Sequence, residues 1–261
     1  VAFAVRRAKR RLWVASAVLL VAIPAMSSSA EARETIRPRA KGLFGYGLEF
    51  KGGVFLPAVV DQGTASDGTT PFRQIFGGDA APIFTLGLDL EVYRGYGTAG
   101  FGGTVGYYAF EGKGIFDDGS PSEDSTGFTI LPLALEVFYR FDWLADRTWF
   151  PLVPYVRGGI AYNFWWVTSG LGKVSRDDGG TPGVEDDVIG EGGKFGVVGT
   201  VGVAILLNGA EPDSAQNLYE STGIRGTYLF GELQAARIDG FGGKGYDFSD
   251  DTWNLGIYFE F

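Results

Sequence analysis

The feature that most constrains this chain is a period of two in its apolar residues, which is most regular in the last segment. Apolar side chains occupy every second position there, with smaller or more polar residues between them. The apolar positions are Trp253, Leu255, Ile257, Phe259 and Phe261. Because successive side chains of a strand point to opposite faces, this segment predicts a β-strand with one continuous apolar face.

The same alternation recurs along most of the chain. It predicts strands at residues 44–56, 82–94, 98–111, 128–142, 153–168, 194–208, 223–237 and 251–261. No apolar segment after the first thirty residues or so is long enough to form a membrane-spanning helix, which needs about 20 apolar residues. If the chain spans a membrane after this point, it must therefore do so with these strands.

The second face of the predicted strands distinguishes a closed barrel from a soluble β-sandwich. A sandwich presents such a face to water, whereas here it carries Gly, Ala and isolated charged or Tyr residues. An eight-stranded barrel has room inside only for side chains, so small residues must alternate with large ones. This requirement also accounts for the 42 glycines among 261 residues. The sequence predicts an all-β fold, an eight-stranded antiparallel transmembrane up-and-down β-barrel over residues 44–261.

The lengths of the connections predict the orientation of the barrel. Outer-membrane barrels have short periplasmic turns and longer extracellular loops. The long connections are expected at 57–81, 112–127, 169–193 and 238–250, and acidic residues outnumber basic ones in them. Both chain ends then lie in the periplasm. The connection 209–222 is long for a periplasmic turn and has the pattern of a short helix.

The first 32 residues have the pattern of a secretory signal peptide. Five basic residues precede residue 12, an apolar stretch runs from 12 to 25, and Ala30-Glu31-Ala32 provides small residues for cleavage. A membrane anchor is the alternative, but Pro24 interrupts the stretch, which is shorter than a spanning helix requires. We expect cleavage after residue 32 and a periplasmic lead over 33–43.

The composition limits the chemistry. The chain has no Cys and no His, which excludes disulfides, thiolate catalysis and thiolate zinc sites and removes the commonest general base and metal ligand. We therefore expect no catalytic residues, no cofactor and no metal site. A net charge of −9 argues against nucleic acid as a partner, because phosphate recognition depends on clustered Lys and Arg.

Charged and polar side chains gather on the predicted inward face. They are expected to pair across neighbouring strands, since an isolated charge inside a barrel is costly. The alternatives are a gated path for protons or ions and, less favoured, a catalytic carboxylate pair. The predicted interior polar cluster consists of Glu49, Lys51, Asp89, Glu91, Glu136, Arg140, Arg157, Glu232 and Gln234.

Two arginines and several tryptophans suggest membrane boundaries. Arg225 and Arg237 fall on the lipid-facing parity of one strand and are expected to extend toward opposite interfaces. Aromatic girdles are expected at both ends, because rings with a polar edge favour the interface. One comprises Trp143, Trp149 and Phe150, and the other comprises Trp165, Trp166 and Trp253.

The alternating segment that ends in Phe261 resembles the C-terminal strand of bacterial outer-membrane β-barrels. Together with the signal peptide, the whole mature chain resembles small OmpA/OmpX-like barrels of the porin-like superfamily, particularly the glycine-rich single-domain type frequent in myxobacteria. The resemblance implies location in the outer membrane, contact with its lipid and lipopolysaccharide, and recognition by the barrel-assembly machinery. The implied assembly signal is Trp253, Leu255, Ile257, Phe259 and Phe261.

These observations predict a non-enzymatic outer-membrane barrel with a filled interior. Its role is expected to be structural, or to lie in contacts of the acidic extracellular loops with an unidentified partner. A narrow channel for ions or small solutes is the first alternative, which the interior charges permit and the strand number disfavours. A soluble lipocalin-like barrel that holds a ligand is the second.

Overall fold

The computed structural model of the chain describes residues 44–63, 70–115, 121–143, 145, 150–168, 176–177 and 188–261. The predicted signal peptide, 1–32, and the predicted lead, 33–43, lie outside these residues. The barrel strands are β1 (Gly45–Phe55), β2 (Ala81–Arg94), β3 (Thr98–Ile115), β4 (Pro121–Arg140), β5 (Leu152–Thr168), β8 (Glu191–Leu206), β9 (Gly226–Arg237) and β10 (Asp250–Glu260). The other elements are η2 (Ala58–Asp61), α1 (Pro71–Phe76), β6 (Arg176–Asp177), β7 (Val188–Ile189) and α3 (Pro212–Thr222).

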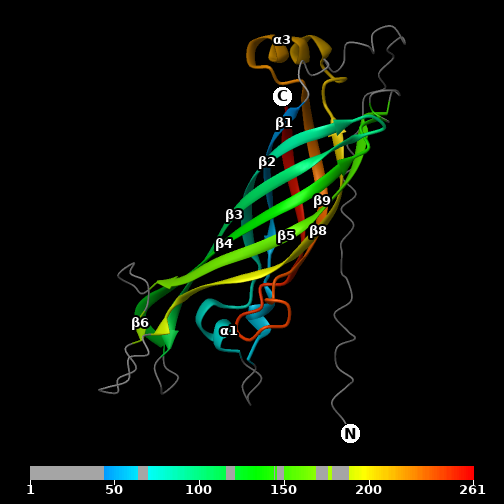
Figure 1. Cartoon of the computed structure of the whole chain (residues 1–261). Helices are drawn as coiled ribbons and strands as arrows, with labels where there is room; N and C mark the ends of the chain where they lie inside the picture. Colours follow the sequence, from blue (N-terminus) through cyan, green and yellow to red (C-terminus); the bar gives the residue numbers. More distant parts are fainter. Residues whose placement is uncertain are drawn as a thin grey trace.

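The barrel strands form a closed antiparallel ring (Figure 1). The order is β1-β10-β9-β8-β5-β4-β3-β2, so each strand pairs with its neighbours in sequence and the first strand closes on the last. The predicted eight-stranded up-and-down barrel is confirmed. β6 and β7 pair only with each other.

Two of the predicted loops are partly strand. β3 and β4 remain paired as far as Ile115 and Pro121, inside the connection predicted at 112–127. β8 begins at Glu191, inside the connection predicted at 169–193. The apolar alternation is weak in both segments because they extend beyond the membrane-facing wall, where a strand needs no continuous apolar face.

The two ends of the barrel carry different elements (Figure 1). Phe261 and α3 lie at one end, which we call the α3 end, and η2 and α1 lie at the other, which we call the α1 end. The helix expected within 209–222 is confirmed as α3. It ends at Gly223, whose φ of 82° places it in the left-handed conformation that glycine tolerates best.

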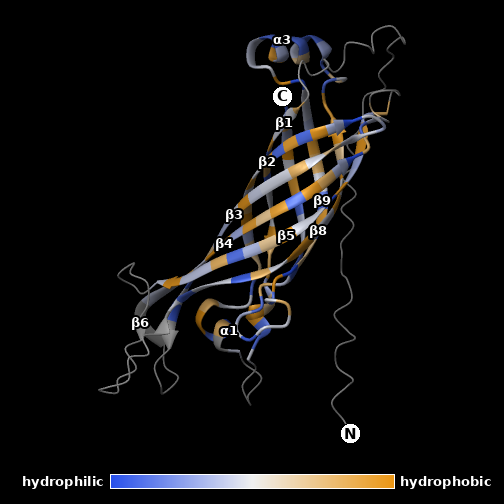
Figure 2. Ribbon diagram, in the orientation of Figure 1, coloured by the Kyte–Doolittle hydropathy of each residue, from blue (hydrophilic) through white to orange (hydrophobic). Residues whose placement is uncertain are grey.

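Hydrophobic and hydrophilic residues alternate along the strands (Figure 2), and exposed and buried positions alternate with them. Outward leucines are largely exposed, with Leu88 at 63%, Leu135 at 66% and Leu233 at 61%. The last strand follows the predicted parity, with Trp253 and Leu255 exposed and Asn254 buried between them. The pattern is the reverse of a soluble barrel, which hides its apolar residues inside.

Inward glycines are required by the narrowness of the barrel. A Cβ atom on Gly159 would overlap the carbonyl oxygen of Leu135, and one on Gly202 would overlap the ring of Tyr155. Neither neighbour can be removed without opening the wall or the interior. The expected relation between glycine content and a packed interior is thus visible at individual positions.

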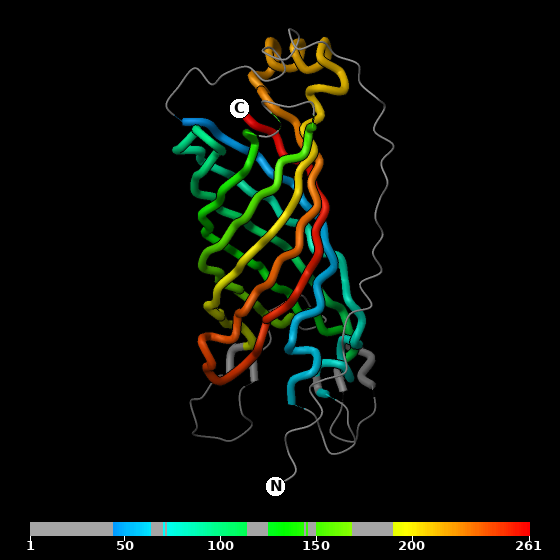
Figure 3. Tube along the Cα trace, turned by 90° about the vertical axis from the view of Figure 1, so that its right-hand side faces the viewer, coloured from blue at the N-terminus to red at the C-terminus, as the bar shows by residue number. Residues whose placement is uncertain are grey.

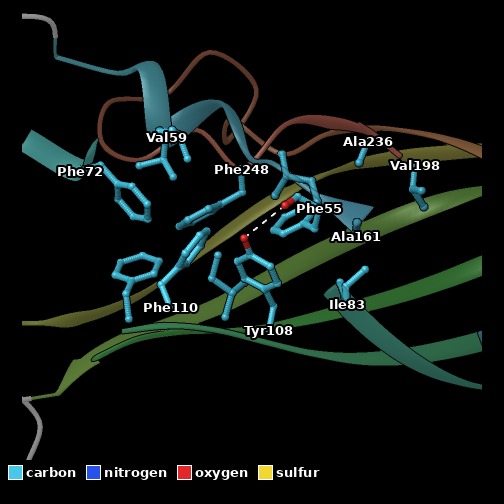
Figure 4. Packing of buried hydrophobic residues seen from close by; sticks show 14 residues of the cluster. Phe55, Val59, Phe72, Ile83, Tyr108, Phe110, Ala161, Val198, Ala236 and Phe248 are labelled. Carbon is cyan, nitrogen blue, oxygen red and sulfur yellow. Dashed lines mark hydrogen bonds between the residues drawn. The ribbon is translucent and has the colours of Figure 1, made fainter. Parts of the chain in front are cut away.

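The interior is divided into two zones. Toward the α3 end it is polar, but toward the α1 end it is an apolar cluster formed mainly by aromatic and branched side chains (Figure 4). Its buried members are Phe55, Val59, Val60, Phe72, Ile83, Tyr108, Phe110, Phe128, Ile130, Ala161, Val198, Ala236, Ile238 and Phe248. The prediction of a polar interior is therefore correct for only one half of the barrel.

Candidate functional site

The predicted polar cluster is present in the interior and almost completely buried. The residues with at most 7% exposure are Glu49, Lys51, Asp89, Glu91, Glu136, Arg140, Arg157 and Glu232. Gln234 is only half-buried, and it lies nearer the α1 end of β9. The strand alternation that points these side chains inward was sufficient to find them.

Arg157 on β5 lies at the centre of the cluster and contacts three carboxylates. Its Nη2 atom pairs with Asp89 and lies 3.2 Å from Glu49 Oε2, and its Nη1 atom lies 3.7 Å from Glu136 Oε2. The carboxylates come from three different strands, so one guanidinium links β1, β2 and β4 to β5. Arginine suits this position because its planar group offers five donors and stays charged.

Lys51 forms the second centre. Its Nζ atom lies 2.8 Å from Glu232 Oε1 and 3.1 Å from Glu49 Oε1. The other oxygen of Glu232 accepts a hydrogen bond of 2.7 Å from the Tyr155 hydroxyl, and Asn254 Nδ2 donates to Oε1 at 3.1 Å. The predicted pairing across strands is therefore observed.

A further layer closes the α3 end and contains residues that the prediction missed. Arg140 pairs with Glu91 and lies 3.6 Å from Glu260. Arg225 lies 3.0 Å from Glu260 and donates to the Phe261 backbone oxygen at 2.5 Å. Glu260 occupies an inward-facing position in the alternation of the last strand, so the sequence could have identified it as a member of the polar cluster.

The lipid-facing assignment of Arg225 is wrong. β9 begins at Gly226, so Arg225 precedes the strand and does not follow its parity, and its side chain turns into the barrel. Arg237, at the other end of β9, does face outward and forms an exposed ion pair of 2.8 Å with Asp251. The prediction for Arg237 is confirmed.

Aromatic rings fill the space around the buried guanidinium groups. The Arg140 guanidinium lies 4.7 Å from the centre of the Tyr258 ring, and that of Arg157 lies 5.4 Å from the Phe138 ring. The cavity beside Arg140, Arg157 and Tyr258 has a volume of about 20 Å³, which is enough for roughly one water molecule. Side chains therefore fill the bore at this level.

The connection between β1 and β2 closes the α1 end. Val59 and Val60 of η2 and Phe72 of α1 are buried in the apolar cluster, where the Phe72 ring lies 5.1 Å from that of Phe110 and 5.3 Å from that of Phe128. We call η2 and α1 together the cap. It covers the polar interior with a dry, aromatic layer.

Hydrogen bonds hold the cap in place. The Thr70 hydroxyl donates to the Val60 carbonyl at 2.6 Å and accepts from the Arg73 N–H at 3.3 Å, which caps the start of α1. Arg73 also pairs with Asp61 at 2.6 Å. The two short helices of the cap are thus tied to each other as well as to the wall.

Exposed aromatic side chains form a girdle at each end of the apolar exterior. At the α3 end they are Phe44, Tyr46, Tyr93, Tyr96, Phe141, Trp143, Phe150 and Phe261. At the α1 end they are Phe84, Tyr107, Phe164, Phe195 and Trp253. Two girdles separated by an aliphatic band are typical of a barrel that spans a bilayer.

Three of the six predicted girdle residues are exposed as expected, and Trp166 is half-buried with its ring 5.7 Å from that of Phe164. Trp143 and Phe150 lie at the α3 end and Trp253 at the α1 end, as expected, whereas Trp149 lies outside the described residues. Trp165 does not face lipid. It stacks on Phe128 at 5.8 Å within the apolar cluster, because its parity on β5 is inward.

Among the described residues, no group of three or more His, Cys, Asp or Glu side chains is arranged to hold a metal ion. Within the same ranges, no helix combines the length and apolar character needed to cross a bilayer.

The closed barrel, the apolar exterior between aromatic girdles and the bore packed with ion pairs and aromatic side chains define a membrane-spanning β-barrel of the small outer-membrane type. Among solved structures, this chain is similar to Ail of Yersinia pestis, in complex with the heparin analogue sucrose octasulfate. The match has 10% identity and a TM-score of 0.39, and it covers 84% of this chain and 97% of Ail. Neisserial surface protein A has 12% identity, a TM-score of 0.40 and coverage of 85% and 98%.

OprG of Pseudomonas aeruginosa is similar at the same level, with 12% identity, a TM-score of 0.39 and coverage of 84% of this chain and 95% of OprG. No known protein family matches the sequence of this chain, and no curated protein matches it significantly.

Proposed function

We propose that the chain is a non-enzymatic barrel of the bacterial outer membrane that does not conduct ions and that acts through contacts at its α1 end, on the outside of the cell. The observation that carries this proposal is the occupied bore. An ion-paired layer fills the half toward the α3 end, and the cap with its aromatic cluster fills the other half. The function must then depend on contacts of the protein's outer surfaces.

The exterior supports the membrane location. Burial of the aliphatic band in hydrocarbon is favourable by about 25 cal/mol per Å² of apolar surface, and water would oppose its exposure. A soluble lipocalin-like barrel needs the opposite arrangement, with an apolar bore and a polar outer face. Lipid and lipopolysaccharide are therefore the proposed partners of the wall, and the outward face of β10 is the proposed signal for the barrel-assembly machinery.

The lengths of the strands support a role for the α1 end. Pairing between β8 and β9 begins at Val197 and Arg237, whereas β5 and β8 remain paired as far as Trp166 and Glu191. β3 and β4 likewise extend past the last partner of β2 on β3, Tyr107. The strands β3, β4, β5 and β8 therefore continue beyond the ring as a projecting sheet, which enlarges the surface available to an extracellular partner (Figure 1).

Planar-bilayer recording separates the proposal from the channel alternative. The purified barrel should give no stable current step above about 0.1 nS, because side chains fill the eight-stranded bore. A reproducible single-channel current above that level in the wild-type protein would contradict the proposal. Fractionation tests the location independently, since the protein should remain with the outer membrane and require detergent for extraction.

Shortening of the projecting sheet tests the surface role. A variant that lacks 113–125 loses the far end of the β3–β4 hairpin but keeps the barrel and the buried Phe110 and Phe128. We expect it to assemble in the membrane and to lose adhesion to other cells or surfaces that the wild-type protein supports. A matched variant with residues 213–221 of α3 replaced by a short linker should retain that adhesion. Equal adhesion by all three proteins would contradict the surface role.

A further inference from the structure

The loop between β9 and β10, residues 238–249, is held in one conformation at the α1 end of the barrel (Figure 3). The Gln62 side chain donates to the Gly245 carbonyl at 2.6 Å. From the opposite side, Lys194 Nζ donates to the Lys244 carbonyl at 2.5 Å. The direction in which this loop presents its side chains is therefore determined by the fold.

One aromatic residue of the loop points away from the protein. Phe248 is fully buried and Tyr246 packs on the aromatic cluster, but the side chain of Phe241 is 73% exposed. Phe241 also has a φ of 56° and is the only non-glycine residue with positive φ in the described part of the chain. That conformation is unfavourable for a residue with a bulky side chain, so the exposed ring is maintained against a local preference.

The loop is attached to the lipid-facing wall immediately beside this ring. The Gly240 N–H donates to the Phe195 carbonyl at 2.9 Å. Phe195 is 57% exposed on the outward face of β8, and its ring lies 4.5 Å from that of Tyr162 on β5. Phe195 belongs to the girdle at the α1 end. Phe241 is therefore the residue next to Gly240, which is hydrogen-bonded to a girdle residue.

We propose that Phe241 inserts into the outer leaflet and anchors the β9–β10 loop to the hydrocarbon chains at the membrane surface. Phe241 is exposed one residue after Gly240, whose N–H is bonded to the outward-facing wall residue Phe195. Transfer of an aromatic side chain from water to the interface is favourable. The loop carries Asp239, Lys244 and Asp247, hence both signs of charge, so recognition of a particular headgroup is not part of the proposal. The proposal rests on the membrane location argued above.

Single-cysteine labelling tests the anchor, because the chain has no native cysteine. Phe241→Cys, Leu88→Cys and Lys244→Cys are each given a nitroxide and reconstituted in phosphatidylcholine vesicles. Collision rates are then measured with oxygen, which concentrates in hydrocarbon, and with a water-soluble nickel chelate. We expect the label at position 241 to report lipid, at a shallower depth than the label at position 88 in the middle of the wall, and the label at position 244 to report water.

The outcomes distinguish this proposal from the membrane location itself. If Leu88→Cys reports lipid and Phe241→Cys reports water, the anchor is wrong and the barrel location stands. If Leu88→Cys also reports water, the membrane location is wrong. Low collision rates with both reagents at position 241 would indicate burial against protein and would also overturn the anchor.

A second measurement avoids any label. Asn tolerates the left-handed conformation but not a hydrocarbon environment, so Phe241→Asn relieves the backbone and removes the anchor. Amide hydrogen exchange of residues 239–246 in vesicles is expected to be at least fivefold faster in Phe241→Asn than in the wild type, and unchanged in Phe241→Trp. Equal exchange in all three proteins would overturn the proposal.

Discussion

Lys51 of β1 and Glu232 of β9 form an ion pair inside the barrel, with Nζ 2.8 Å from Oε1 and both side chains at most 4% exposed. The two residues are 181 positions apart in the sequence. Only β10 separates their strands in the ring, so the pair exists only when the first strand has closed on the last. Barrel closure and the satisfaction of these buried charges are therefore one event.

Removal of one partner should be costly. In Lys51→Met the Glu232 carboxylate stays buried without its cation, and the free energy of unfolding is expected to fall by about 3–5 kcal/mol, measured by urea titration in lipid vesicles. The double variant Lys51→Met/Glu232→Met should regain part of that loss, because no charge of the pair remains. A loss below about 1 kcal/mol in the single variant would contradict the pair.

Two adjacent glycines of β5 should differ in their tolerance of a methyl group. In Gly159→Ala the new Cβ would overlap the Leu135 carbonyl oxygen, and overpacking of this kind costs about 1–3 kcal/mol. In Gly158→Ala the nearest atom is the Val198 oxygen at 3.7 Å, an ordinary contact. Unfolding titrations should show destabilisation in the first variant and none in the second. Similar stabilities would mean that the β4 backbone does not approach Gly159 as closely as described.

The two arginines at opposite ends of β9 allow a second comparison between a buried and an exposed position. Arg225→Leu removes a cation 3.0 Å from the buried Glu260 carboxylate and leaves Arg140, which is farther away at 3.6 Å. We expect this to destabilise the barrel by about 3 kcal/mol. Arg237→Leu breaks an exposed pair with Asp251 and should cost about 0–1 kcal/mol. Thermal unfolding followed by gel mobility compares them, and equal losses would restore the lipid-facing assignment of Arg225.

The cap should depend on its aromatic contact with the wall. Phe72→Ala removes the ring that packs on Phe110 and Phe128, a truncation that typically costs about 3–5 kcal/mol. Because pairing of the barrel strands does not depend on Phe72, we expect the loss of stability to appear locally, as faster amide hydrogen exchange in η2 and α1. Phe84→Ala, on the outer wall, is the control and should leave exchange in the cap unchanged.

Strand number, direction and parity could be predicted from the sequence because each follows from local alternation. Leu88 and Asp89 are neighbours in the chain, one apolar and one charged. Apolar and polar residues alternate in this way along β2, and a β-strand places such neighbours on opposite faces. The same reasoning identified the buried acids and bases. This reasoning failed at Arg225, because β9 begins only at the next residue, Gly226, and the alternation of the strand does not extend to Arg225.

The apolar zone could not be predicted, because the pattern is ambiguous toward the α1 end. Tyr107 faces outward and Tyr108 inward, yet both are tyrosines, so alternation in hydropathy does not separate them. The burial of Val59, Val60 and Phe72 depends on a connection that folds back into the bore. No local signal in that connection distinguishes a cap from an exposed loop.

The sequence by itself determined that one face of the chain is greasy and the other small or charged, and a closed wall with an apolar outside follows because every backbone group in a bilayer must find a partner within the protein. Only the tertiary structure decided which buried charges meet, how far β3, β4, β5 and β8 project, and how Phe241 is presented. Those features depend on shear, closure and loop packing, which join residues that are far apart in the chain and leave no periodic mark on it.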